Sequence, residues 1–221
     1  MMAARPNIVP IAIFAREPIP AQTKTRLIPL LGAEGAAAFH AKLVEHALTV
    51  ALEADLGPVE LWVAGDSNAG FFQHMKSRYG IELRVQSAGD LGQRMAAVFA
   101  QAEGPQLLMG SDCPVICPRL LRNCAQALRD NAAVLLPAED GGYGLIGLQK
   151  LGQPTLQDSF QKLFQNVEWG SDGVMARSRE ILRTIDLPWS EPAVIWDLDR
   201  PADWERLRQD DALYQKVMGF S

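Results

Sequence analysis

The stretch LLMGSDCPVI, residues 107–116, passes from an apolar core segment directly into a polar loop. The three large apolar residues at 107–109 are typical of a buried strand, and the two small residues after them allow a turn. Asp112 is then the first charged residue beyond the strand. An aspartate at the mouth of a core strand is either a turn residue or part of a site.

Similar apolar runs alternate with segments of helical periodicity along the chain. The predicted strands are 7–15, 59–65, 81–86, 106–110 and 132–138, and the predicted helices are 33–54, 70–78, 92–102 and 118–129. This alternation predicts an α/β fold in three layers, a Rossmann-like and mostly parallel sheet with helices on both faces. No linker or repeat divides the chain, so we expect one domain over residues 1–221.

The composition limits the classes of partner. The chain has 221 residues and a net charge of -5, which would repel nucleic acid and anionic membranes. No apolar run approaches the roughly 20 residues of a membrane span, and the N-terminus lacks the layout of a signal peptide. Three cysteines, an odd number, predict reduced thiols rather than a disulfide framework. We expect a cytoplasmic protein with no nucleic-acid partner and no membrane span.

A basic loop, REPIPAQTKTRLIPLLG (16–32), follows the first strand. Arg16, Lys24 and Arg26 form a cluster of cations suited to phosphate oxygens. The loop has no glycine before Gly32, so it is neither a Walker loop nor a dinucleotide-binding turn. A solvated basic loop is the alternative, but ligands of open parallel sheets bind where the strands end, which favours a phosphate site.

Two further loops follow strands of the predicted sheet. In SAGDLGQRM (87–95), the loop and helix start could hold a base or phosphate, but a helix cap at Asp90 is the more frequent role. In PAEDGGYGLIGL (137–148), Gly141 and Gly142 are compatible with a tight hairpin or with close approach to a substrate. The spacing does not decide between these two interpretations.

Acidic residues supply candidate metal ligands. Asp112, beside the basic loop, has the chemistry of a Mg²⁺ or Mn²⁺ ligand, with a turn residue as the alternative. The segment VIWDLDRPADWERL (194–207) is expected to be a short strand leading into a helix, with Asp197 and Asp199 on one face. Ser171 or Asp172 is the expected cap of a later helix. The three histidines lie scattered in helical segments and receive no catalytic role.

Taken in order, several of these segments resemble the DUF2064 family, which is glycosyltransferase-A-like and related to the 2-phospho-lactate guanylyltransferases. The most specific parts are KTRL (24–27), GSDCP (110–114) and EDGGY (139–143), and the resemblance runs from about Ile11 to about Leu207. It implies a nucleotide-diphospho-sugar transferase type of fold and a metal-assisted transfer.

The resemblance also implies residue roles. Phosphates would lie on Arg16, Lys24 and Arg26; the nucleotide would lie near Asp90, Gly92 and Arg94; the metal would bind Asp112 and Asp199; and residues 139–143, with Gly141 and Gly142, would face the acceptor. The chain departs from the family pattern at two places. The family usually has Pro-Gly where this chain has Pro20-Ala21, and it usually has Trp-Ser-Thr where this chain has Trp169-Gly170-Ser171. Asp112 also lacks the second acid of an Asp-x-Asp signature.

These features predict a transferase that depends on Mg²⁺ or Mn²⁺ and uses a nucleoside-phosphate donor. The family's usual naming favours transfer of a glycosyl group from a nucleotide sugar to an unknown small-molecule acceptor. The basic loop and the lone Asp112 favour the alternative, a nucleotidyl transfer that releases pyrophosphate from a nucleoside triphosphate. In both reactions Lys24 and Arg26 would stabilise charge, and Asp140 would be the general base. A non-catalytic nucleotide-binding protein is the third hypothesis.

Overall fold

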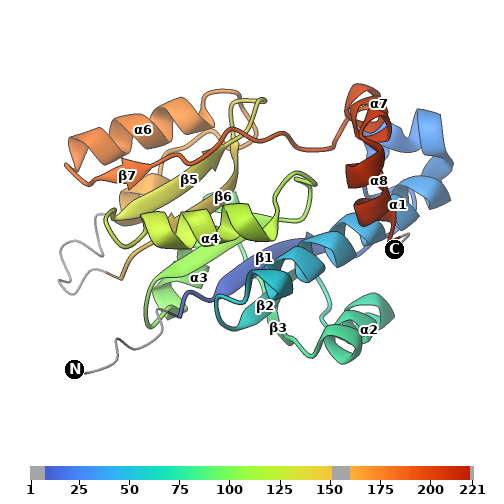
Figure 1. The fold of residues 1–221 in the computed structure, drawn as a ribbon, viewed down its shortest axis with the longest axis horizontal. Helices are drawn as coiled ribbons and strands as arrows, with labels where there is room; N and C mark the ends of the chain where they lie inside the picture. The colour runs from blue at the N-terminus through green and yellow to red at the C-terminus, as the bar shows by residue number, and fades with distance from the viewer. Residues whose placement is uncertain (1–7, 151–159, 220–221) are drawn as a thin grey trace.

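A seven-stranded sheet lies at the centre of the computed structural model, which describes residues 8–150 and 160–219 (Figure 1). The strands are β1 (Ile11–Arg16), β2 (Val59–Ala64), β3 (Glu82–Val85), β4 (Gln106–Gly110), β5 (Ala133–Pro137), β6 (Tyr143–Leu148) and β7 (Trp189–Ser190). The helices are η1 (Thr25–Leu27), α1 (Ile28–Ala54), α2 (Gly70–Tyr79), α3 (Leu91–Gln101), α4 (Pro118–Ala127), η2 (Lys162–Phe164), α6 (Val174–Thr184), α7 (Pro201–Gln209) and α8 (Asp211–Met218).

The sheet order is β3-β2-β1-β4-β6-β5-β7. β6 pairs antiparallel with β4 and with β5, and the other pairs are parallel. The predicted α/β fold with a mostly parallel sheet is therefore confirmed. The five predicted strands are β1 to β5 with ends shifted by a few residues, and Asn7, the predicted start of the first, lies outside the described residues.

Helices cover both faces of the sheet. On one face α1, α2 and α4 pack over alternate strand residues such as Ile13 and Leu107. On the other face α3, η2 and α6 pack over the intervening residues, Ala12 and Leu108 among them. The alternation follows from the period of a strand, in which successive side chains point to opposite faces. The two C-terminal helices, α7 and α8, lie together at one end of the molecule beside α1 (Figure 1).

The structure corrects several expectations about elements. β6 and the two-residue β7 were not predicted as strands, and the strand expected at 194 is wrong, since only an isolated bridge joins Ile195 to Ala138. The helix expected from residue 33 begins at Ile28 and passes through a kink at Gly32. The N-cap position of α6 is occupied by Gly173, so no side chain at that position caps the helix. The cap expected at Ser171 or Asp172 is therefore also wrong.

One helical stretch, Thr25–Ala54, is long and apolar enough to cross a membrane by length and composition alone. Within the structure, its Phe39 and Leu43 are buried against the C-terminal helices. A core helix meets the same criterion, so the stretch is weak evidence for a membrane span.

Candidate functional site

A cleft of about 350 Å³ opens where the parallel strands end. Its lining comes from the ends of β1, β2 and β4, from the β5–β6 hairpin and from the segment 169–174. Five charged residues line the cleft, and all of them lie in segments that the sequence analysis identified: Arg16, Arg94, Asp112, Asp140 and Asp197. The parallel strands end together at this edge of the sheet, and their loops therefore gather around the cleft. This is the place where the sequence predicted a ligand site.

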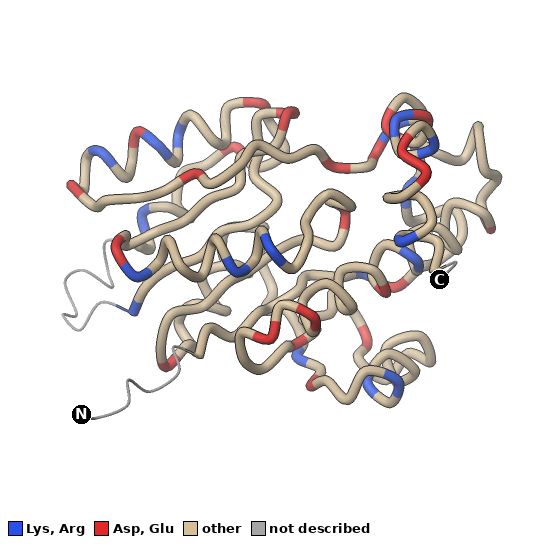
Figure 2. Tube along the Cα trace, in the orientation of Figure 1, with Lys and Arg blue, Asp and Glu red and all other residues tan. Residues whose placement is uncertain are grey.

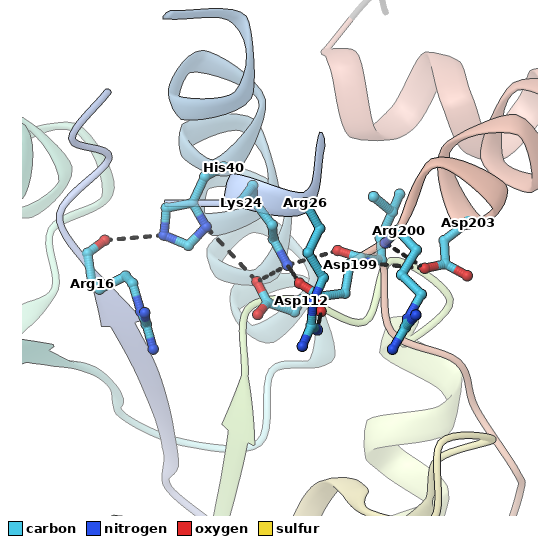
Figure 3. A network of polar contacts seen from close by, with 9 residues as sticks. Arg16, Lys24, Arg26, His40, Asp112, Asp199, Arg200 and Asp203 are labelled. Atoms are coloured by element: carbon cyan, nitrogen blue, oxygen red, sulfur yellow. Dashed lines mark hydrogen bonds and ion pairs between the residues drawn. The ribbon is translucent and has the colours of Figure 1, made fainter. Parts of the chain in front are cut away.

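Lys24 lies outside this lining, in a buried position between two carboxylates. Its Nζ donates to the carbonyl oxygen of Leu198 at 2.6 Å and lies 3.1 Å from Oδ1 of Asp112. Oδ1 of Asp199 is 3.9 Å away, and the Lys24 side chain is only 4% exposed. Figure 3 shows the ammonium between the end of β4 and the segment before α7. Its donors are directed at protein acceptors, whereas the sequence suggested that they face a phosphate.

Asp112 has one oxygen buried and the rest of its carboxylate accessible. Oδ1 is shielded from solvent, while the side chain as a whole is 46% exposed. Desolvation raises the pKa of Asp112, but the nearby charges of Lys24 and His40 lower it by more, so the pKa lies below its ordinary value. The carboxylate is ionised at neutral pH and presents oxygen to the cleft, as a cation ligand requires.

His40 belongs to the site although the sequence gave it no role. It projects from α1 and lines the cleft, with Nε2 3.1 Å from the carbonyl oxygen of Arg16. Since that carbonyl only accepts, Nε2 carries the proton, and Nδ1 then faces Oδ1 of Asp112 at 3.8 Å without a hydrogen bond. Burial lowers the pKa of His40. Its position within the buried stripe of α1, next to Phe39, was the available signal.

The remaining basic residues divide into two groups. Arg16, at the end of β1, and Arg94, in α3, line the cleft, and Arg94 also donates from Nε to the carbonyl oxygen of Gly89 at 2.9 Å. Arg26 lies at the surface and forms an ion pair with Asp199 (Figure 3). Both oxygens of Asp199 thus face cations, which distinguishes it from Asp112.

The residues at the start of α3 have clear packing roles. Asp90 is the N-cap of α3 and forms a capping box with Gln93. Of the two roles considered from the sequence, a helix cap is the one that the structure shows. A Cβ on Gly92 would lie 2.4 Å from the carbonyl oxygen of Phe164 and 2.7 Å from Nε1 of Trp169. Gly92 therefore allows α3 to approach protein groups on η2 and on the 169–174 segment.

The β5–β6 hairpin places one acid in the cleft. Oδ1 of Asp140 accepts from the N–H of Gly142 at 2.9 Å, which fixes the turn, and both residues line the cleft. A Cβ on Gly141 would lie 2.1 Å from the carbonyl oxygen of Asp172, so this glycine lets the start of α6 approach the hairpin. Glu139 points outward to a two-point ion pair with Arg206.

Asp197 is a further acid that the sequence did not rank as a ligand. It lines the cleft, whereas Asp199, two residues later, turns to Lys24 and Arg26. Burial and the charge of Asp140 raise the pKa of Asp197. The two acids of this segment were expected on one face; the structure directs them to different partners.

Aromatic and sulfur groups complete the lining. Tyr143 and Trp169 meet edge to face with ring centroids 6.3 Å apart. Burial raises the pKa of the Tyr143 hydroxyl and of the Cys113 thiol, which makes Cys113 a packing residue under the cleft. All three cysteines are free thiols, as predicted. Among the described residues no group of three or more His, Cys, Asp or Glu is placed to hold a metal ion alone.

The chain matches a known protein family. The family model described as "Uncharacterized protein conserved in bacteria (DUF2064)" matches residues 47–171. No curated protein matches the chain.

Solved structures of similar fold cover almost the whole chain. A protein of Desulfovibrio desulfuricans G20, inferred to be a nucleotide-diphospho-sugar transferase, is 25% identical, with a TM-score of 0.76 over 95% of this chain and 97% of that one. A CMP:2-keto-3-deoxy-manno-octonic acid synthetase complexed with CTP is 16% identical, with a TM-score of 0.58 over 94% and 99%. Rv0371c of Mycobacterium tuberculosis H37Rv in complex with manganese is 18% identical, with a TM-score of 0.54 over 92% and 98%.

Proposed function

The chain belongs to the DUF2064 family, and from this premise and its fold we propose that it is a transferase acting on a nucleoside triphosphate and a divalent metal ion. In the proposed reaction an acceptor hydroxyl attacks the α-phosphorus, a new phosphate ester forms, and pyrophosphate leaves. The similarity to a nucleotide-diphospho-sugar transferase and to a CTP-bound synthetase supports a nucleotide substrate.

One observation carries the proposal: the cleft combines two arginines with the exposed carboxylate of Asp112. Arg16 is the last residue of the central strand β1, and Arg94 lies on α3, which packs on one face of the sheet. Guanidinium groups can each hold two phosphate oxygens, and a carboxylate can hold a metal ion that bridges them. This arrangement supports a polyphosphate chain lying along the ends of β1 and β4.

The residues present fit a divalent cation. Asp112 offers an accessible oxygen, and Asp140 and Asp197 line the same cleft, so the donors are hard oxygens of the kind that Mg²⁺ and Mn²⁺ prefer. No described group of three such side chains could hold the ion by itself, which leaves coordination positions for phosphate oxygens. When bound, the metal would supply positive charge to the phosphates.

We assign Lys24 and Arg26 a positioning role in this reaction. Lys24 holds Asp112 and the segment at Leu198 together from a buried position, and Arg26 holds Asp199 at the surface. Because the ammonium lies between two carboxylates, it keeps their repulsion from opening the site before the metal and nucleotide arrive. Asp140 would accept the proton of the attacking hydroxyl with the oxygen that does not bind Gly142.

The alternative reaction is transfer of a glycosyl group from a nucleotide sugar. The name of the Desulfovibrio desulfuricans protein favours it. The lone acid in Ser111-Asp112-Cys113, without a second acid two residues away, favours nucleotidyl transfer, as do the two arginines available to a triphosphate. The product separates them, because nucleotidyl transfer releases pyrophosphate and glycosyl transfer releases a nucleoside diphosphate.

The test is a thermal-shift screen with Mg²⁺, in which the four common nucleoside triphosphates are compared with nucleotide sugars. We expect a triphosphate with Mg²⁺ to raise the unfolding temperature and Asp112→Asn to remove most of the metal-dependent part of that rise. Asp130→Asn, at an exposed acid in the turn after α4, is the matched control and should retain the full shift. An unchanged shift in Asp112→Asn would show that Asp112 does not hold the metal.

A further inference from the structure

Three buried side-chain atoms in the described part of the chain lack a hydrogen-bond partner, and all three belong to residues that line the cleft. Nδ1 of His40 and Oδ1 of Asp112 are acceptors that face each other, as described above. The third atom, Nε1 of Trp169, is a donor. A buried donor without an acceptor destabilises the state that contains it, so the position of this indole requires an explanation.

The indole of Trp169 is held by packing alone. It rests on the first turn of α3, where a Cβ on Gly92 would lie 2.7 Å from Nε1 and 2.9 Å from Cε2. Its ring meets that of Tyr143 edge to face, and the Tyr143 hydroxyl has an acceptor of its own, Sδ of Met95 at 3.8 Å. No hydrogen bond of the indole has to break for the ring to turn away from Gly92. A phenylalanine ring would fill much of the same space without the unpaired donor.

The segment that carries Trp169 presents only neutral groups to the cleft. Its two acids, Glu168 and Asp172, are exposed and absent from the described lining, and Figure 2 marks an acidic residue just before α6. Oγ of Ser171, which does line the cleft, already donates to the carbonyl oxygen of Glu168 at 2.8 Å. Among the described residues 165–173, the indole N–H is therefore the unpaired polar side-chain group at the cleft.

Positive charge at the same end of α3 comes from Arg94. Its Nε donates to the carbonyl oxygen of Gly89 at 2.9 Å, which holds the guanidinium beside the start of the helix. Its terminal nitrogens make no hydrogen bond with the residues that the structure describes, and Arg94 lines the cleft together with Trp169. A guanidinium and a neutral N–H donor at one end of a helix suit an anionic oxygen, because hydrogen bonds to charged acceptors are the stronger ones.

We propose that Trp169 binds the donor substrate: its indole N–H donates to a phosphate oxygen of the nucleoside triphosphate once the ring turns away from Gly92. The triphosphate itself rests on the proposed function. In this role Trp169 is a binding residue whose donor is unpaired in the free protein and paired in the complex. It also connects the segment 169–174 to the nucleotide.

The first test is nuclear magnetic resonance of the full-length protein labelled with ¹⁵N. The chain has five tryptophans, and the indole N–H resonance that is missing in Trp169→Phe identifies Trp169. We expect this resonance to move downfield when Mg²⁺ and the triphosphate with the largest thermal shift are added, since a hydrogen bond to an anionic oxygen deshields the proton. The corresponding nucleoside, which has no phosphate, should leave it in place. A resonance that stays when the triphosphate saturates the protein, or that moves equally with the nucleoside, would overturn the inference.

The second test separates binding from packing. Trp169→Phe keeps an aromatic ring and removes the N–H, so it should weaken triphosphate binding about tenfold in calorimetry through loss of one hydrogen bond to a charged group. The urea midpoint of the free variant should stay close to that of the wild type, because removal of an unpaired donor offsets the smaller ring. Equal triphosphate affinities of the variant and the wild type would contradict a contact with the donor.

Trp189→Phe is the matched control. The indole Nε1 of Trp189 donates to Oε1 of Glu191 at 2.8 Å, and Trp189 is absent from the described lining of the cleft. This variant should therefore lower the urea midpoint and leave triphosphate affinity unchanged. Equal weakening of triphosphate binding by both variants would assign the effect to general loosening of the fold and overturn the inference.

Failure of the proposed function has a different signature. If no triphosphate raises the unfolding temperature of the wild-type protein, then the donor assignment is wrong and the role of Trp169 falls with it. If the thermal shift is present and Trp169→Phe binds the triphosphate normally, then the role of Trp169 alone is wrong.

Discussion

Ala21 adopts a left-handed backbone conformation, with φ of 61°, in the loop that leads to Lys24. The family resemblance placed a glycine here, and the substitution raised the question of whether the loop has another shape. The structure answers it in part, because Ala21 takes the conformation that glycine favours. The geometry of the loop is therefore reached at an energetic cost, since a Cβ in this region is strained by about 1 kcal/mol or more.

Ala21→Gly should stabilise the protein by about 0.5 kcal/mol, because relief of the strained φ outweighs the added freedom of the unfolded chain. Denaturant unfolding measures the change. Ala38→Gly, at an exposed position in the middle of α1, is the matched control and should destabilise by about 1 kcal/mol. Equal destabilisation by both substitutions would contradict a strained Ala21.

The residue types predicted which charged groups line the cleft better than they predicted which side chains pair with one another. Asp112 and Arg16 lie in the cleft where the strand-end rule puts them. Lys24 instead contacts the carbonyl oxygen of Leu198, 174 positions away in sequence, and the carboxylates of Asp112 and Asp199, so its partners come from segments far apart in the chain. No local pattern encodes such a contact, and for the same reason His40 was predicted to have no role.

At the scale of elements, strands that contain a short apolar run were predicted from the sequence, whereas β6, the hairpin partner of β5, was not. β4 and β5 were recognised because each contains a short run of apolar residues, at 107–109 and at 133–137, of the kind typical of a buried strand. β6 contains Gly144 and Gly147, which weaken the strand signal. A Cβ on Gly147 would lie within 2.6 Å of Leu107 and Val134 side chains, so the glycine is required by close packing between neighbouring strands.

A charged clamp fastens β7 to α6. Arg179 of α6 donates to both oxygens of Glu191, at 2.9 and 2.6 Å, and the indole Nε1 of Trp189 donates to the same carboxylate at 2.8 Å. The hydrogen bonds from Arg179 lower the pKa of Glu191 below its ordinary value despite partial burial. The clamp tethers the start of the segment that carries Asp197 back toward the cleft.

Glu191→Gln should destabilise the protein by about 1 kcal/mol at neutral pH, a figure reduced for partial solvent exposure. Because the folded pKa of Glu191 is below the unfolded value, its contribution is complete above the unfolded pKa and is lost as the pH falls through the folded pKa. The difference between wild type and variant, measured by urea unfolding from pH 7 downward, should therefore shrink in acid. Glu180→Gln, which breaks an exposed pair with Arg177, should change stability by less than about 0.5 kcal/mol at every pH. A pH-independent difference for Glu191→Gln would contradict the clamp.

At the scale of the whole molecule, the packing supports our proposal that the chain is one domain, as the sequence suggested. One buried cluster runs from Val9 to Ile195 and includes residues of β1, β2, β4, β5 and β6. A second cluster, containing Leu27, Phe39 and Trp204, joins the C-terminal helices to the N-terminal half. Phe39 and Trp204 meet edge to face with centroids 4.7 Å apart. Neither half of the chain buries its apolar surface without the other.

Such interdigitated packing predicts a single cooperative unfolding transition. Tryptophans report on separate regions, with Trp62 in β2, Trp189 in β7 and Trp204 in α7, while far-ultraviolet circular dichroism follows the helices on both faces. Urea curves from fluorescence and from circular dichroism should therefore coincide, because a two-state protein loses all its structure together. Trp204→Leu, which truncates the contact with Phe39, should lower the midpoint of both curves equally, by removal of part of a shared core. If α7 and α8 instead formed a separate unit, the fluorescence change of the wild type would precede the loss of helix, and Trp204→Leu would abolish that early phase while leaving the main transition in place.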